Sequence, residues 1–364
     1  MIGVRRLEKA EIKNRKVLLI VDYNTKELNG SVFKVDQTLP TIQYVLDKEP
    51  VVLFILTHLG RPKDRKSHST RPLYNYLKEK ISKSNKIIRY VLVSEYSPSN
   101  GIKSSKEGSI LFGDNSRYYS KAELEDFYTN FDIIINDAFG CAHREAPFRA
   151  YAGFLMMKEI EALSLALGCD FLIMGGAKVS DKIKLVQQFN TTVFLGGAIA
   201  TSIYKSKGYE VGSNTLVEEI VDISINNKVN NIILPVDFIV INKEQGYENK
   251  EIGAILKTDT VIDIGSKSVE NLERLVGKSR FILWNGPLGK FEDPKARSTH
   301  LLVEKLIKGK ARVVAGGGET TSAIFRCNAS AGSELYHIST GGGAMLSFLG
   351  GKHMPGIESV EDKV

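Results

Sequence analysis

Short, continuously apolar runs recur along the chain and alternate with segments of helical spacing. In the first half these runs are KVLLIVDY (16–23), VVLFILT (51–57), IIRYVLV (87–93), SILFG (109–113) and DIIIND (132–137). A strand is apolar at every position when both of its faces are covered, as in a parallel sheet packed between helices. LPTIQYVLDK (39–48) and TRPLYNYLKEKIS (70–82) show helical spacing between these runs. The first half is therefore predicted to form a parallel α/β sheet.

The second half repeats this pattern, but its apolar runs end in glycine or in a proline turn. The runs are DFLIMGG, TTVFLGG, NIILPVD, SRFILWNG, ARVVAGGG and LYHISTGGG. A chain of 364 residues exceeds the size of a single core. We predict an α/β fold of two doubly wound, Rossmann-like parallel-sheet domains joined by an inter-domain helix and hinge. The expected parts are a first domain (1–153), the inter-domain helix (154–168), a second domain (169–350) with an excursion loop (241–260), and a tail (351–364) packed on the first domain.

Composition indicates the class of protein, its cellular compartment and the charge of its partners. The hydrophobic fraction of 43% and the charged fraction of 25% are those of a globular protein. No apolar run has the length of a bilayer span, and the charged N-terminus lacks a signal-peptide block, so we expect a cytoplasmic protein with no membrane partner. Three scattered cysteines favour a reduced compartment without a zinc ribbon or a disulfide framework. The net charge of +7 indicates anionic partners.

Polar side chains follow the apolar runs of the first half. Because ligands bind beyond the carboxyl ends of parallel strands, these positions are candidates for a site. They are Asp22, Asn24, His58, Arg61, Arg117, His143 and Arg144. Guanidinium forks suit phosphate or carboxylate, whereas a single arginine more often forms a surface salt bridge. Three arginines placed alike favour an anion site.

Glycine-rich segments occupy the corresponding positions in the second half. They are GGAK (175–178), GGAIA (196–200), NGPLGKFE (285–292), GGGETT (316–321) and STGGGA (339–344). Any one of them is equally well a tight strand-to-helix turn, but five together favour a cradle for nucleotide phosphates. A P-loop, a dinucleotide GxGxxG motif and the protein-kinase motifs are all absent from the sequence. A nucleotide enzyme of another kind is therefore indicated.

Nine segments in order give the chain a resemblance to the phosphoglycerate kinase family, from about Val17 to Ile357. They are VDYN, LPTI, THLGRP, NDAFGCAHR, GGAKVSDKI, LPVDF, WNGPLGKFE, GGGET and HISTGGGA. The resemblance implies a glycolytic phosphotransferase that moves a phosphoryl group from 1,3-bisphosphoglycerate to ADP, giving 3-phosphoglycerate and ATP. It further implies triose binding by the N-terminal domain, Mg2+ as magnesium-ADP or magnesium-ATP on the C-terminal domain, transfer in a closed two-domain cleft, and a monomer.

The resemblance also assigns roles to individual residues. It implies catalytic roles for Lys178, Lys34, Gly341 and Gly342. The implied triose-binding residues are Asp22, Asn24, Lys34, His58, Leu59, Gly60, Arg61, Arg117, His143 and Arg144. The implied nucleotide-binding residues are Gly176, Ala177, Lys178, Lys182, Gly196, Gly197, Asn285, Pro287, Glu292, Gly317, Gly318, Glu319 and Thr320. Glu319 is expected to contact the magnesium of the nucleotide.

Three positions depart from the family pattern. Ile20 stands where the family has arginine, and we expect the loss of that charge to alter packing or an ion pair more than chemistry. Lys34 replaces an arginine that reaches the phosphoryl group, and Glu319 replaces aspartate. Lysine keeps the charge but loses the bidentate fork, so a slower enzyme is expected.

Two alternatives to an active enzyme remain at this point. One is a catalytically weakened relative that binds nucleotide and has a regulatory or interaction role, because Lys34 and Glu319 both depart from the family pattern. The other is nucleic-acid binding, which is disfavoured because the lysines are scattered and KDRKSH (63–68) is their densest run. We therefore expect no specific nucleic-acid partner.

Overall fold

The computed structural model describes residues 3–24, 28–64, 67–81, 88–95, 109–218 and 231–362. Parts of three sequence predictions lie outside these residues. They are Ser82 of the predicted helix 70–82, Ile87 of the predicted strand 87–93, and Arg65 and Lys66 of the basic run. Among the described residues, no helix combines the length and apolar character needed to cross a membrane.

Internal contacts divide the chain into two compact units. Unit 1 is Met1–Glu161 together with His353–Val364, and unit 2 is Ala162–Lys352. The division falls inside helix α5 (Phe154–Ala166), within the segment for which the sequence predicts an inter-domain helix. Each unit contains a six-stranded parallel sheet, so the predicted fold class is confirmed.

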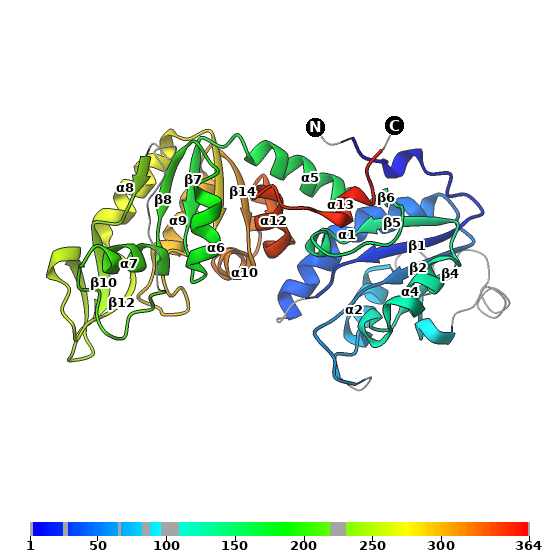
Figure 1. Cartoon of the computed structure of the whole chain (residues 1–364), viewed down its shortest axis with the longest axis horizontal. Coiled ribbons are helices and arrows are strands. Elements are labelled where there is room, and N and C mark those ends of the chain that lie inside the picture. Colours follow the sequence, from blue (N-terminus) through cyan, green and yellow to red (C-terminus); the bar gives the residue numbers. More distant parts are fainter. Residues whose placement is uncertain are drawn as a thin grey trace. The chain divides into compact units, whose positions relative to one another are not determined.

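The sheet of unit 1 has the strand order β3-β4-β2-β1-β5-β6, with every pair parallel (Figure 1). Its strands are β1 (Lys16–Val21), β2 (Val52–Leu56), β3 (Ile88–Val91), β4 (Ser109–Gly113), β5 (Ile133–Asp137) and β6 (Tyr151–Ala152). The helices are α1 (Leu28–Asp47), α2 (Arg71–Ile81), α4 (Lys121–Tyr128) and α13 (Pro355–Glu358), with 3-10 turns η1 (Leu7–Lys9), η3 (Val93–Glu95), η4 (Ser116–Tyr118) and η5 (Phe139–Cys141). The central strands β2, β1 and β5 are thus neighbours, with their carboxyl ends at one edge.

Both faces of this sheet are covered, which explains the continuously apolar strands. Val17 and Leu19 of β1 pack in one cluster with residues of α1 and α2. Leu18 packs in a second cluster with Phe127 of α4, on the opposite face. Successive strand residues point to opposite faces, so each face requires its own apolar set. Ile20 packs against the second cluster, in line with the expected role in packing.

Helix α1 is longer than its sequence pattern indicates. The spacing predicts a helix over 39–48, whereas α1 begins at Leu28, ends at Asp47 and contains Pro40. A proline disfavours the helical conformation of the preceding residue, which hides the first half of this helix from sequence analysis. Val35 lies in the core before Pro40, and Ile42 and Val45 lie in it after Pro40. Tertiary packing thus overrides the local preference, and Lys34 lies on a helix.

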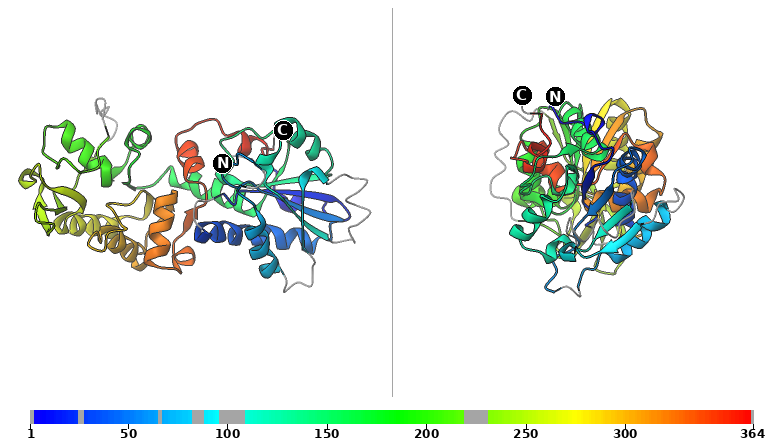
Figure 2. Two further views of the ribbon diagram at one scale, coloured as in Figure 1. Left: turned by 90° about the horizontal axis from the view of Figure 1, so that it is seen from below. Right: turned by 90° about the vertical axis from the view of Figure 1, so that its right-hand side faces the viewer.

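The C-terminal segment belongs to unit 1 (Figure 2). The Gly356 amide donates to the Ala142 carbonyl at 2.8 Å, and Asn136 Nδ2 donates to the Gly356 carbonyl at 3.1 Å. Val4 and Glu361 form an antiparallel bridge. The two ends of the described chain therefore meet beside strand β6, where Arg6 bridges to Ala152.

The main sheet of unit 2 has the strand order β15-β14-β13-β7-β8-β9, also fully parallel. Its strands are β7 (Phe171–Met174), β8 (Thr192–Leu195), β9 (Asn231–Ile233), β13 (Phe281–Asn285), β14 (Arg312–Gly316) and β15 (His337–Ser339). The helices are α6 (Val179–Val186), α7 (Gly197–Ser206), α8 (Ser266–Lys278), α9 (Ser298–Lys308), α10 (Gly318–Cys327), α11 (Ala331–Glu334) and α12 (Gly342–Leu349). Helix α6 contacts α7 and α12, while α9 contacts α8 and α10.

The predicted excursion loop (241–260) is wrong. Strands β10 (Asp237–Ile241) and β11 (Tyr247–Glu251) form an antiparallel hairpin, and after the turn η6 (Ile252–Ala254) strand β12 (Thr260–Ile264) pairs with β10. Strand β11 has the sequence YENKE at the edge of this three-stranded sheet and is largely exposed. An exposed edge strand carries no alternation of apolar residues, so hydrophobic pattern alone does not reveal it.

We predict that Asp137 makes the stability of unit 1 depend on pH. Asp137 is buried, and its Oδ1 accepts a hydrogen bond from the Met156 amide of α5 at 2.9 Å. Burial raises the pKa of its carboxyl from 3.8 to about 6. The folded state therefore binds this proton more tightly than the unfolded chain, and it gains stability as the pH falls from about 6 to about 4, on the order of 3 kcal/mol.

The variant Asp137→Asn has no proton to bind at this position and should lack this gain. Urea unfolding of both proteins at neutral pH and near pH 4.5 measures the effect. The unfolding free energy of the wild type, relative to that of the variant, should be larger at the lower pH. An identical pH dependence in the two proteins would contradict the prediction.

Candidate functional site

The carboxyl ends of β1 and β2 bring the first group of polar residues together. Asp22 and Asn24 follow β1, and His58 follows β2. Lys34 reaches the same place from α1: its Nζ donates to Asp22 Oδ2 at 2.8 Å and to the Asn24 carbonyl at 3.0 Å. The Asn24 amide donates to Asp22 Oδ1 at 3.0 Å. The structure thus joins Asp22, Asn24 and Lys34 in one hydrogen-bonded group.

Asp22 is held as a carboxylate. Burial alone raises the pKa of its carboxyl, but the charge of Lys34 and hydrogen bonds from Lys34 and the Asn24 amide bring that pKa below its ordinary value. Lys34 is therefore the cation that stabilises this buried charge. One amine serves two acceptors here, so its remaining proton is the one available to a ligand.

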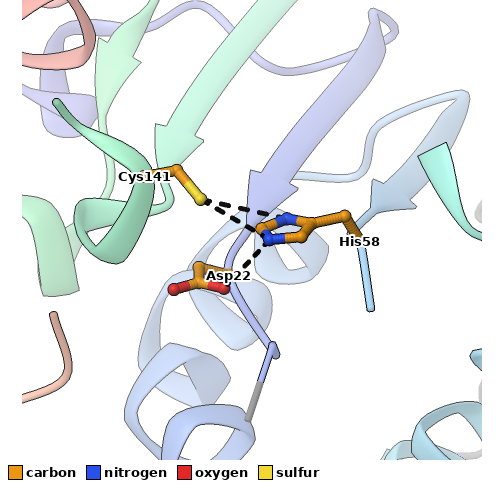
Figure 3. Close-up of side chains that lie close together, drawn as sticks. All are labelled: Asp22, His58 and Cys141. Atoms are coloured by element: carbon orange, nitrogen blue, oxygen red, sulfur yellow. Dashed lines mark hydrogen bonds and ion pairs between the residues drawn. The ribbon is translucent and has the colours of Figure 1, made fainter. Parts of the chain in front are cut away.

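His58 is a neutral imidazole at physiological pH. Burial lowers its pKa to about 4, and the positive charges of Arg117 and Arg144 act in the same direction, while Asp22 opposes them. Its Nε2 lies 3.8 Å from Asp22 Oδ1 (Figure 3). Because the ring is neutral, this contact is not an ion pair.

The loop that follows His58 is held in place by its neighbours. The Gly60 amide donates to Asn24 Oδ1 at 2.8 Å, and Arg117 Nη1 donates to the Gly60 carbonyl. The Leu59 amide donates to Asn115 Oδ1 at 3.2 Å, and Asn115 Nδ2 donates back to the Leu59 carbonyl at 2.7 Å. Gly60 has a φ of +59°, which favours glycine. Gly60 and Leu59 therefore take part in the site through their backbone amides and carbonyls, which fix the loop in position.

Three arginines give this edge of unit 1 its positive charge. Arg117 is half-buried, whereas Arg61 and Arg144 are exposed. Burial lowers the pKa of Arg117, and the charges of Arg144 and Arg61 lower it further. His143 is exposed, and burial of part of its ring and the charge of Arg144 lower its pKa. Guanidinium groups this close repel one another, and an anion bound between them would relieve that repulsion.

Two residues of this site were missed by sequence analysis. Asn115 is fully buried and supports the loop at Leu59, and the strand-end rule applied to the residues directly after SILFG (109–113) would have identified it. Gly140 lies so close to Asp22 that a Cβ at this position would collide with the carboxylate. A packing requirement of this kind depends on tertiary structure and leaves no mark on the sequence.

Five glycine-rich loops follow five neighbouring strands of unit 2. They come after β7, β8, β13, β14 and β15, which the sheet order places side by side. Helices α6, α7, α10 and α12 begin at or directly after four of these loops. The first amides of a helix lack partners within the helix, so helices that begin at one edge create a region suited to anions.

Glycine is required where these loops cross. Gly176, Gly286 and Gly317 have φ values of +77°, +95° and +107°. The Gly176 amide donates to the Pro287 carbonyl at 2.7 Å, and the Gly197 amide donates to the Leu288 carbonyl at 2.8 Å. The loops after β7, β8 and β13 are thus bonded directly through their backbones, with Gly196 as the N-cap of α7.

The two lysines of GGAKVSDK occupy different environments. Lys178 is the exposed N-cap residue of α6, so it precedes the helix. Lys182 is buried inside α6, and its Nζ donates to the Gly175 carbonyl at 2.6 Å. Burial lowers the pKa of Lys182 to about 8, with Glu319 raising it and Lys178 lowering it. Lys178 and Glu319 are therefore close enough to Lys182 for their charges to change its pKa.

The first turn of α10 carries Glu319 and Thr320. Glu319 is exposed, whereas Thr320 is buried and its Oγ1 accepts a hydrogen bond from the Gly286 amide at 2.7 Å. Asn285 is also buried, and its Nδ2 donates to the Gly316 carbonyl at 2.6 Å. Thr320 and Asn285 thus connect the loops after β13 and β14. Unlike Thr320 and Asn285, Glu319 has a solvent-exposed side chain.

The remaining predicted residues of unit 2 differ in their placement. Gly341 is the N-cap of α12, and Gly342 packs against Gly317, where a Cβ would lie 2.8 Å from the Gly317 Cα. Ala177 and Gly318 lie in the loops before α6 and at the start of α10. Glu292 is exposed in the segment before α9. In the described part of the chain, no hydrogen bond or ion pair joins the Glu292 side chain to the other four glycine-rich segments.

Comparison with known proteins identifies the family of the chain. A family model described as phosphoglycerate kinase matches residues 7–352. The chain is 33% identical to the phosphoglycerate kinase of Finegoldia magna over 395 residues, which cover 99% of both chains. It is 33% identical to that of Dictyoglomus turgidum over 393 residues, which cover 98% of both.

The chain belongs to the phosphoglycerate kinase family. Two solved structures of the family are similar over nearly the whole chain. Phosphoglycerate kinase from Coxiella burnetii gives a TM-score of 0.80 at 28% identity and covers 98% of both chains. That from Pyrococcus horikoshii OT3 gives 0.81 at 27% identity and covers 97% of this chain and 98% of the other. The chain is therefore a phosphotransferase, and the family predicted from its motifs is confirmed.

We predict that Gly286→Ala destabilises unit 2. A Cβ at Gly286 would collide with the Gly175 carbonyl and lie 2.7 Å from Lys182 Nζ, and the φ of +95° adds strain. The expected loss is about 2 kcal/mol or more of unfolding free energy, as for other changes that force a strained backbone.

Gly277→Ala is the matched control, because Gly277 lies inside α8 with open space around it. Alanine is favoured over glycine in a helix by about 1 kcal/mol, so this variant should be neutral or more stable. Denaturant unfolding of both variants measures the difference. Equal stability of the two variants would show that the loop crossing does not require glycine.

Proposed function

We propose that the two units divide the phosphoglycerate kinase reaction between them. In this proposal unit 1 binds 3-phosphoglycerate or 1,3-bisphosphoglycerate, and unit 2 binds ADP or ATP. The contrast between the two strand-end regions carries the proposal: unit 1 presents arginine side chains at its edge, whereas unit 2 presents glycine backbone and helix N-termini.

The triose fits unit 1 by charge and by hydrogen bonding. Arg61, Arg117 and Arg144 supply guanidinium groups for its phosphate. Asp22, Asn24 and neutral His58 supply acceptors and donors for its hydroxyl and carboxyl groups. His143 is proposed as a further member of this set and is exposed, as Arg61 and Arg144 are. Lys34 is proposed to meet the phosphoryl group that moves.

The nucleotide fits the glycine loops of unit 2. Backbone amides at the starts of α10 and α12 and the amine of Lys178 are proposed to face its phosphates. Mg2+ prefers oxygen ligands and keeps several waters, so one exposed carboxylate at a helix start suits it. Glu319 meets this requirement and is proposed to hold the metal of magnesium-ADP or magnesium-ATP. When bound, the metal neutralises phosphate charge.

Neutralisation of charge is the main task of the protein in this reaction. The nucleophile is already an anion, so no side chain needs to take a proton from it. Lys34, Lys178 and the amides at Gly341 and Gly342 are proposed to stabilise the negative charge of the transferring group. The proposal includes closure of the units about α5, because water must be excluded during transfer.

The proposal extends to the state of the protein in the cell. The three cysteines of the sequence are few and widely spaced, which suits the reducing cytoplasm. We propose a cytoplasmic monomer, since one chain supplies both the triose and the nucleotide residues.

We predict that Lys34 limits turnover. A guanidinium can bond to Asp22 and also offer the phosphoryl group a planar fork in place of a single amine proton, so Lys34→Arg should raise kcat about tenfold, the equivalent of about 1.4 kcal/mol. Lys34→Met should lower kcat by about 100-fold or more. Steady-state assays of ATP formation measure both changes.

Lys48→Arg is the control for Lys34→Arg, because Lys48 is exposed and its Nζ lies over the Tyr44 ring. It should leave kcat unchanged. If Lys34→Arg also left kcat unchanged, the departure at this position would not slow the enzyme.

We predict that Glu319→Ala weakens magnesium-nucleotide binding. Loss of the carboxylate should raise the Mg2+ concentration needed for half-maximal activity, and nucleotide KM should increase about tenfold, as for loss of a charged contact. Titration of magnesium-ADP by calorimetry and kinetic assays measure these effects. Glu270→Ala, a change of an exposed glutamate on α8, is the control. Unchanged affinity and turnover in Glu319→Ala would exclude a role for Glu319 at the metal.

A further inference from the structure

Three side chains with different metal-binding atoms meet in unit 1. They are Asp22 after β1, His58 after β2 and Cys141 at the end of η5, which follows β5 (Figure 3). His58 Nε2 lies 3.8 Å from Asp22 Oδ1 and 3.8 Å from Cys141 Sγ. One ligand atom from each residue lies within 4.8 Å of the others. Among the described residues, this is the only group of three or more such side chains.

We propose that Asp22, His58 and Cys141 form a binding site for a thiophilic divalent cation of the zinc class. The site is distinct from the proposed magnesium position, because that position lies in unit 2. It is carried by the convergence of three different ligand atoms.

The separation of Cys141 Sγ and His58 Nε2 is close to the one that a tetrahedral zinc ion requires. Zinc binds sulfur at about 2.3 Å and imidazole nitrogen at about 2.0 Å, so tetrahedral geometry separates these two atoms by about 3.5 Å. The corresponding separation in the structure is 3.8 Å. A movement of a few tenths of an ångström therefore brings Cys141 and His58 to bonding positions. The fourth position of the ion remains for a water molecule.

Each ligand can bind the ion and keep its present role in the structure. Lys34 bonds to Asp22 Oδ2, whereas His58 faces Oδ1, so the carboxylate can hold the amine with one oxygen and the metal with the other. The Asn24 amide occupies only one lone pair of Oδ1. Cys141 releases its thiol proton to solvent when the sulfur binds the ion.

The chemistry of the ligands selects the class of metal. Magnesium and calcium require sets of oxygen ligands, whereas one sulfur, one nitrogen and one oxygen suit zinc. Lys34, Arg117 and Arg144 are positively charged and act on His58 and Cys141, so their charge weakens the binding of a cation here. The thiolate and the carboxylate offset this charge, so reversible binding is expected in place of a permanent structural metal.

Occupation of this site would block the triose. Asp22 and His58 are triose ligands in the proposed function, and a bound cation would engage both. The cation should therefore act as an inhibitor that competes with 3-phosphoglycerate. This consequence rests on the proposed function, whereas metal binding itself does not.

Cobalt(II) absorption tests binding directly. Co2+ occupies zinc sites and gives a sulfur-to-metal charge-transfer band when a thiolate binds it. The wild type should show this band with one equivalent of Co2+, and Cys141→Ser should lose it, with affinity lowered by more than about tenfold. Cys327→Ser is the matched control and should keep the band, because Cys327 lies in unit 2. Absence of the band from the wild type, or its persistence in Cys141→Ser, would overturn the site.

X-ray absorption of the zinc-loaded wild type is a second test that requires no variant to fold. It should show one sulfur at about 2.3 Å with nitrogen or oxygen ligands. No sulfur, or two, would contradict the site.

Kinetics test the inhibition separately. Zn2+ should raise the apparent KM for 3-phosphoglycerate in the wild type. In Cys141→Ser it should have no such effect, while turnover without zinc stays unchanged. Binding without competition would retain the metal site and overturn its link to the triose.

Discussion

Parallel pairing of the central strands is the constraint on which both candidate regions depend. Each strand runs in the same direction as its neighbours, so the loops that follow them meet at one edge. In unit 1 this brings Asp22 after β1 next to His58 after β2. In unit 2 it brings five glycine loops together. The parallel strand order alone therefore makes neighbours of residues that are far apart in sequence.

The two units solve the problem of binding an anion in different ways. Unit 1 uses charged side chains. Burial and repulsion between its positive charges lower the pKa values of His58 and Arg117. Unit 2 relies on backbone amides, which require glycines where its loops cross. Among its described residues, Lys182 is the only lysine or arginine that is buried. Side chains can adapt to a small triose, whereas fixed amides suit a chain of phosphates. This difference supports the proposed division of substrates.

Sequence analysis predicted the strands of both main sheets except β6, because a buried parallel strand is apolar throughout, whereas β6 has only two residues. It also found most residues at the strand ends, since that rule needs only the order of elements. It missed the start of α1, where packing of Val35 overrides the effect of Pro40. It missed the edge strand β11, which lacks an apolar pattern. Asn115, Gly140 and the neighbourhood of Cys141 depend on tertiary contacts, which no local pattern records.

The central claim is that the triose region of unit 1 and the nucleotide region of unit 2 together perform phosphoryl transfer. A coupled assay of ATP formation by the purified wild-type chain, from 1,3-bisphosphoglycerate and magnesium-ADP, tests this claim most directly. We expect turnover that saturates with each substrate and requires Mg2+. Binding of both substrates without turnover above background would contradict the account, and it would identify the chain as a member of the family that has lost catalysis.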